Sequence, residues 1–248
     1  MEGGIVVREW MEELVRRLQA AFGARLRFVG LQGSRARGEA APESDIDAVV
    51  ILDDVALEDL RAYRGLLKTM PEREKVCGFF GGAAELARWD RADLFSFIHD
   101  TIPFHGDLSA LTLPLGREDA RRAALKGACD IYHGCAHGLL FDRDPAALRA
   151  LYKMAAFALR AVYFCRTGEY VFRTDDLRER LTIAEARLLD GREAARTLAD
   201  DGAVYEELCE RLRIWSAGAI RDMSGANAND TGSRLQLNAA RVILDNDN

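Results

Sequence analysis

The chain has 248 residues, of which 49% are hydrophobic and 30% charged, the composition of an ordinary globular protein with enough length for one or two domains. Its net charge of −6 argues against a nucleic-acid partner, because proteins that grip DNA or RNA normally carry a basic excess. No apolar run reaches the length of about 18 residues that a membrane-spanning helix requires, so we expect no membrane partner.

The first half of the chain alternates between helical and strand patterns. The predicted order is helix 6–22, strand 25–31, strand 48–52, helix 56–69, strand 76–80, helix 83–89 and strand 93–98. In the first helix, Trp10, Leu14 and Leu18 recur at helical spacing, and Gly23 follows as a stop. This alternation predicts an α/β domain whose sheet has helices packed on it.

The segment between the first two strands carries residues suited to phosphate chemistry. Asp45 and Asp47 stand two residues apart at the start of a strand, so both carboxylates point to one face. Their Cα atoms would lie roughly 6.5 Å apart, which lets both carboxylates bind one small cation. Mg²⁺ suits such a site because it takes one or two carboxylates together with substrate phosphates. Gly33 lets a phosphate approach the backbone closely, and Ser34 adds a hydroxyl and an N–H group.

These residues also resemble a known signature. Gly33-Ser34, ten intervening residues and Asp45-Ile46-Asp47 are similar to the motif of the nucleotidyltransferase superfamily, which includes DNA polymerase β and the aminoglycoside nucleotidyltransferases. The run Gly-Ser-Arg-Ala-Arg-Gly and the later Ser-Asp-Ile-Asp resemble the minimal nucleotidyltransferase branch most closely. The resemblance implies an α/β (α+β) nucleotidyltransferase domain with a mixed sheet, which we place at residues 1–114.

The resemblance further implies a third carboxylate on a neighbouring strand. Asp93 heads the predicted strand 93–98 and is our choice, both as a metal ligand and as the base that takes the proton of the acceptor hydroxyl. Asp100 stays open as the alternative, because strand ends are poorly located from sequence, and Asp90 is a weaker candidate.

Three basic residues are candidates for binding the nucleotide phosphates. Arg35 and Arg37 lie inside the motif, and a guanidinium group matches phosphate oxygens well. Lys153 lies on a later predicted helix, away from its apolar face. For each of the three, an ordinary solvated side chain is the alternative interpretation.

After residue 114 the pattern becomes helical, which predicts a bundle domain over 115–223. Asp144-Pro145 opens the clearest helix, with Asp at the N-cap and Pro at the first helical position, and Gly168 ends it. The other predicted helices cover 118–132, before a Gly-rich break, and 174–191, 192–199 and 203–219. We interpret residues 224–248, which hold all five asparagines, as a flexible or weakly docked tail.

The cysteine and histidine content gives weaker indications. Five cysteines without a C-x-x-C pair, and an N-terminus without a signal-peptide pattern, predict reduced thiols and a cytoplasmic location. Cys129, His133 and His137 are spaced by four along a helix, but no fourth zinc ligand is evident. We therefore interpret the small residues around them as packing positions.

The combined expectation is a Mg²⁺-dependent nucleotidyltransferase. It would transfer a nucleotidyl group, with AMP from ATP expected ahead of other NTPs, to a hydroxyl of a small molecule or a protein, and release pyrophosphate. The alternative is an antitoxin-like regulatory protein of the minimal nucleotidyltransferase type that acts on a partner protein. The acceptor and the nucleotide preference are not named by any residue, and a homodimer is left open.

Overall fold

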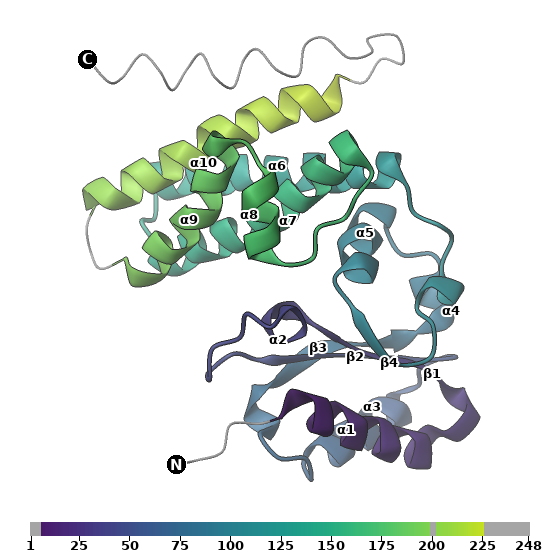
Figure 1. Ribbon diagram of the computed structural model, residues 1–248. Helices are drawn as coiled ribbons and strands as arrows, with labels where there is room; N and C mark the ends of the chain where they lie inside the picture. The colour runs from purple at the N-terminus through teal and green to yellow at the C-terminus, as the bar shows by residue number, and fades with distance from the viewer. Residues whose placement is uncertain (1–5, 199–201, 226–248) are drawn as a thin grey trace, which may run out of the picture. The chain divides into compact units, whose positions relative to one another are not determined.

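The computed structural model describes residues 6–198 and 202–225. The chain divides into two compact units, Met1–Pro114 and Leu115–Asn248 (Figure 1). In the described part of the chain, no helix combines the length and the apolar character of a membrane span.

The N-terminal unit is built on a four-stranded mixed sheet. Its strands are β1 (Leu26–Gln32), β2 (Ile46–Leu52), β3 (Val76–Gly82) and β4 (Ile102–His105), in the order β3-β2-β1-β4. Strand β1 runs antiparallel to β2 and β4, whereas β2 and β3 are parallel. The mixed sheet that the resemblance implied is therefore confirmed.

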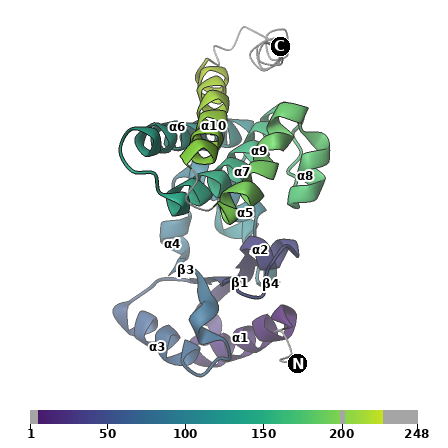
Figure 2. The same ribbon diagram turned by 90° about the vertical axis from the view of Figure 1, so that its left-hand side faces the viewer.

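Helices cover both faces of this sheet (Figures 1 and 2). The helices are α1 (Val7–Phe22), α2 (Gly33–Arg37), α3 (Leu57–Leu67), α4 (Ala83–Leu86) and α5 (Arg91–His99). Leu14 and Leu18 of α1 pack with Val29 and Val50 in one buried cluster, so the alternate residues of β1 and β2 face this helix. Residue Asp47, one position out of phase with that set, faces the opposite side, where α2 and α5 lie.

The predicted strand over 93–98 is wrong, because these residues form helix α5. The Asp90 carboxylate caps the helix by accepting a hydrogen bond of 2.9 Å from the backbone N–H of Ala92. The apolar residues after it were compatible with either pattern, and this cap, together with burial of Leu94 and Phe95 on one side, decides for a helix. The last strand of the sheet is β4 instead, where Pro103 is tolerated because β4 is an edge strand.

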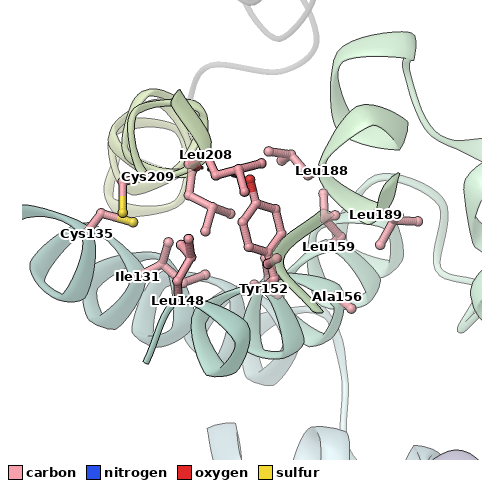
Figure 3. Close-up of a cluster of buried hydrophobic side chains, with 14 of the residues drawn as sticks. Ile131, Cys135, Leu148, Tyr152, Ala156, Leu159, Leu188, Leu189, Leu208 and Cys209 are labelled. Atoms are coloured by element: carbon pink, nitrogen blue, oxygen red, sulfur yellow. Dashed lines mark hydrogen bonds between the residues drawn. The ribbon is translucent and has the colours of Figure 1, made fainter. Parts of the chain in front are cut away.

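The second unit is the predicted helical bundle. Its helices are α6 (Arg117–Leu140), α7 (Pro145–Thr167), α8 (Thr174–Arg180), α9 (Ile183–Thr197) and α10 (Gly202–Ser224). Helix α7 has the predicted ends, since the Asp144 carboxylate accepts from the N–H of Ala146 at 2.8 Å and Gly168 adopts a left-handed conformation with φ of 80°. Figure 3 shows the bundle core around the ring of Tyr152, whose hydroxyl donates to the carbonyl of Leu208 at 3.0 Å.

Two helix boundaries differ from the prediction. Helix α6 continues through the Gly-rich stretch to Leu140, because Gly134 and Gly138 let α6 approach Leu151 and Tyr205. A Cβ on either glycine would come within 2.6 Å of those side chains, so these glycines serve packing and do not break the helix.

The predicted helix 174–191 is divided into α8 and α9. Thr182 and Glu185 form a reciprocal capping box, in which the Thr182 hydroxyl accepts from the Glu185 N–H and the Glu185 carboxylate accepts from the Thr182 N–H. This box starts α9 at Ile183, and the helix then runs on to Thr197. The interpretation of a tail over 224–248 falls almost entirely outside the described residues.

Candidate active site

Gly33 places the backbone of the motif directly against the Asp47 carboxylate. Its φ of 75° lies in the region that favours glycine, and it opens α2 immediately after β1 ends at Gln32. A Cβ added at Gly33 would lie 2.0 Å from Oδ2 of Asp47. The glycine turn and the second aspartate of the motif are therefore in direct contact in the fold.

Asp45 and Ser34 present polar groups beside this contact. Asp45 directly precedes β2 and is exposed, while Asp47, two residues on, is half-buried. Among the residues that the structure describes, none is hydrogen-bonded to the Asp45 carboxylate or to the Ser34 hydroxyl. Two carboxylates, which are hard oxygen donors, therefore stand two residues apart at the start of β2, and the Ser34 hydroxyl follows Gly33 in α2.

Arg35 holds the loop that leads into Asp45. Its guanidinium donates to the carbonyl oxygens of Ser44, at 2.7 and 3.1 Å, and of Asp45, at 3.1 Å. These bonds connect α2 to the backbone just before β2. The predicted contact of Arg35 with phosphate stays a prediction, and its observed contacts act on the position of Asp45.

Arg37 is buried, with 5% of its surface exposed, in an ion pair with Asp100. Its Nε also donates to Glu39 at 3.0 Å. Burial by itself would lower the pKa of Arg37, but the adjacent Asp100 and Glu39 carboxylates outweigh it, and the pKa is raised above its ordinary value. The guanidinium is therefore a fixed cation inside the N-terminal unit, and its predicted contact with phosphate also remains a prediction.

Thr101, next to Asp100, is bonded to the other end of α2. The amide of Gln32, the residue before Gly33, donates to the Thr101 hydroxyl at 2.7 Å and to the Phe97 carbonyl at 2.9 Å. The consecutive residues Asp100 and Thr101 thus hold α2 from both sides, through Arg37 and Gln32. Sequence reasoning missed Gln32 and Thr101, because no local pattern marks the pairing of two distant strand ends.

The register of the sheet places Gln32 and Thr101 close to the aspartate pair. Gln32 lies opposite Asp47 in the β1–β2 ladder, so their side chains share a face. Leu31 lies opposite Ile102 in the β1–β4 ladder, which brings Thr101 next to Gln32. Asp100 is therefore close to the motif in the fold, although it is distant in the sequence.

The remaining predicted residues lie elsewhere. Asp93 is exposed in the first turn of α5, seven residues before Asp100. Its expected position at the head of a strand is wrong, while its role as third carboxylate stays a prediction. Lys153 is exposed on α7, in the helical unit, and its contact with phosphate likewise stays a prediction.

Arg160 of α7 is only 2% exposed, which is unusual for an arginine on a helix. Its guanidinium donates to the carbonyls of Ala156, Val171 and Phe172. Arg160 therefore fastens the segment after α7 to the bundle.

No group of three or more His, Cys, Asp or Glu side chains within residues 6–198 and 202–225 is arranged to hold a metal ion. Cys129, His133 and His137 are all exposed on α6, and the two imidazole centroids are 6.3 Å apart.

Comparison with known proteins agrees with this geometry. Residues 11–81, from α1 to β3, match the sequence model of the family described as nucleotidyltransferase domain. No curated protein matches the chain. Among solved structures, the chain is similar to spectinomycin adenyltransferase AAD(9) from Enterococcus faecialis, crystallised with ATP and spectinomycin. The identity is 13%, the match covers 83% of this chain and 98% of that chain, and the TM-score is 0.51.

The matched region contains Gly33, Ser34, Asp45 and Asp47, and in the structure Gly33 lies directly against Asp47. At 13% identity the structural likeness concerns the fold, and it extends over both units of the chain. Residues 11–81 thus match a nucleotidyltransferase domain, and the chain as a whole is similar in fold to a spectinomycin adenyltransferase.

Proposed function

We propose that this protein transfers AMP from ATP to a hydroxyl group of a small molecule and releases pyrophosphate. The observation that carries the proposal is the contact between the Gly33 backbone and the Asp47 carboxylate, with the exposed Asp45 beside it. The similar spectinomycin adenyltransferase was crystallised with ATP and a small-molecule acceptor, which favours the same pair of substrate classes here.

The donor set fits a magnesium ion. Asp45 and Asp47 supply carboxylate oxygens, the ligand type that Mg²⁺ prefers, and Mg²⁺ usually completes its coordination with substrate phosphates and water. When bound, the ion would neutralise charge that develops on the transferring phosphate.

The chain's own residues have distinct parts in this proposal. The Ser34 hydroxyl and the backbone at Gly33 bind phosphate oxygens, since a side chain at position 33 would fill the space beside Asp47. Arg35 fixes the backbone carbonyl of Asp45 and so orients its carboxylate. For the base that accepts the hydroxyl proton, the exposed Asp93 is accessible to solvent, whereas Asp100 is engaged by Arg37.

The test uses ATP labelled in either of two positions. Purified protein, Mg²⁺ and ATP labelled at the α-phosphate should transfer label to a compound in a panel of aminoglycosides, aminocyclitols and small-molecule extracts, with stoichiometric pyrophosphate. ATP labelled at the γ-phosphate should place its label only in pyrophosphate. Label from the γ-phosphate in the acceptor would mean phosphoryl transfer and would contradict the proposal.

The second candidate is an antitoxin-like protein of the minimal nucleotidyltransferase type. The motif residues resemble that branch most closely, which is the observation in its favour. In the same assay with a cell lysate, α-label in one protein band and none in the small-molecule fraction would favour this candidate over the first.

A substitution at Gly33 tests the central contact. Gly33→Ala should lower the rate of AMP transfer by about 10²-fold or more, because the new methyl group would displace the Asp47 carboxylate and strain the backbone. Gly38→Ala is the matched control, since Gly38 has nearly the same φ of 72° but no atom within 4 Å of an added Cβ. Comparing initial rates and melting temperatures of the two variants separates displacement of Asp47 from backbone strain. Equal losses of rate would refute the importance of the contact.

A further inference from the structure

The helical unit contains a cavity of about 200 Å³ among α7, α9 and α10, and every residue that lines it belongs to this unit. Its walls are mainly apolar and include Leu188 of α9 and Trp215, Ala219 and Met223 of α10. Leu188, Ala219 and Met223 are buried, and Trp215 is half-buried. None of the predicted or observed motif residues contributes to it, so the cavity is not explained by the nucleotidyltransferase motif.

Two of the charged residues in the cavity wall, Arg166 and Glu185, form an ion pair with each other. Arg166 donates to both carboxylate oxygens of Glu185, at 2.8 and 3.0 Å, and the Thr182 hydroxyl donates to the same carboxylate at 2.8 Å. Burial by itself would raise the pKa of Glu185, but the hydrogen bonds from Arg166 and Thr182 have the larger effect. The pKa of Glu185 is therefore below its ordinary value. The pair is therefore ionised at neutral pH with no net charge, and it shapes the wall without selecting a charged ligand.

The other charges at the cavity are two arginines and one carboxylate. Arg211 donates through one nitrogen to Glu207, at 2.7 Å, a residue that does not line the cavity. For the guanidinium of Arg221, the described residues provide no hydrogen-bond or ion-pair partner. Because Glu207 neutralises Arg211, the charges that are left in the wall are those of Arg221 and Asp222. A guanidinium group favours carboxylate and phosphate oxygens, so Arg221 is the group of the wall that suits an anion.

The volume of the cavity limits the size of the apolar part of any ligand that binds there. An apolar cavity of about 150 Å³ in a protein is large enough to bind benzene. A cavity of about 200 Å³ with an aromatic wall therefore suits one ring or a compact fused pair.

We propose that this cavity binds a small aromatic acid, a one- or two-ring body with a single carboxylate or phosphate group. The ring lies against Trp215 and Leu188, and the acidic group meets Arg221 at the rim. The site is separate from the proposed transfer of AMP, and its occupation does not require ATP.

The probe is 2-naphthoate, with 2-naphthalenemethanol as an uncharged control of the same size, and binding is measured by titration calorimetry on the full chain. Naphthoate should bind at least about tenfold more tightly than the alcohol, the effect of one charge-assisted contact. Arg221→Gln should remove this difference. Arg213→Gln, on the same helix but paired with Glu210 and outside the cavity, should keep it.

A second variant fills the cavity. Gly218 lines it, and a Cβ added there meets no atom within 4 Å, so Gly218→Leu should occupy the space without a clash. This variant should lose naphthoate binding while its melting temperature stays equal or rises, because leucine is a better helix former than glycine.

Three results would overturn the proposal. They are no binding of naphthoate to the wild type, equal binding of acid and alcohol, and unchanged naphthoate binding by Gly218→Leu. If sedimentation shows a dimer that Gly218→Leu dissociates, and naphthoate does not bind, then a second copy of the chain occupies this surface and the proposal is also wrong.

Discussion

Asp47→Asn and Asp45→Asn should each lower the rate of AMP transfer by about 10³-fold or more, with the fold intact. A bound divalent ion contributes several kcal/mol to the stabilisation of the transition state, and each 1.4 kcal/mol changes the rate about tenfold. Replacing either carboxylate by an amide removes a charged ligand of that ion at nearly constant side-chain volume. The measurement is the single-turnover rate with ATP labelled at the α-phosphate.

Two further readouts separate loss of the ligand from loss of the fold. The melting temperature without nucleotide should stay equal or rise slightly, since neighbouring carboxylates repel each other when no cation lies between them. The upward shift of the melting temperature caused by Mg²⁺ and ATP together should disappear in both variants. Full Mg²⁺-dependent activity in both would show that these carboxylates do not hold the ion.

A control at the other end of β2 completes the series. Asp54→Asn removes a carboxylate that is 79% exposed and forms an ion pair with Arg25 at 3.0 Å. Exposed pairs of this kind contribute about 0–1 kcal/mol to stability. Because Asp54 lies beyond the end of β2 at Leu52, far along the strand from Asp47, its variant should keep normal activity.

Asp100→Ala should lower the free energy of unfolding of the N-terminal unit by about 3–5 kcal/mol. The substitution leaves the buried guanidinium of Arg37 without its main partner, and an uncompensated buried charge is costly. It also releases one of the two ties that hold α2, so Gly33 and Ser34 lose part of their positioning. Asp93→Ala is the matched control on α5, where an exposed first-turn carboxylate contributes about 0.3–1 kcal/mol.

Urea unfolding in a Trp215→Phe background makes this measurement specific to the N-terminal unit. The chain has three tryptophans, and the two that remain, Trp10 and Trp89, both lie in that unit. The double variant Arg37→Met with Asp100→Leu should recover most of the lost stability, because an apolar pair of similar volume carries no desolvation cost. If Asp100→Ala costs no more than Asp93→Ala, or the double variant is less stable than Asp100→Ala, then the ion pair is not what holds this region.

The sequence by itself determined the features that depend on neighbouring residues in the chain. The ends of α7 follow from an Asp-Pro start and a Gly stop, which satisfy local backbone groups. Gly33, Asp45 and Asp47 could be identified because the turn and the strand that bring them together are separated by a short loop.

Only the tertiary structure decided the features that depend on a distant partner. Residues 93–98, an acidic residue followed by mostly apolar ones, suit a strand, but burial of one side and the Asp90 cap make them helical. The glycines of α6 would weaken an isolated helix, yet close packing on α7 and α10 compensates for them.

Charged residues show the same dependence most clearly. An arginine in a sequence is expected in solvent, but Arg37 is buried because Asp100, 63 residues away, neutralises it, and Arg160 is buried because backbone carbonyls after α7 accept its hydrogen bonds. Helix caps and short motifs have their partners within a few residues and can be predicted from sequence. The partner of a buried charge is chosen by the fold, so its role becomes visible only once the strands and helices have been brought together.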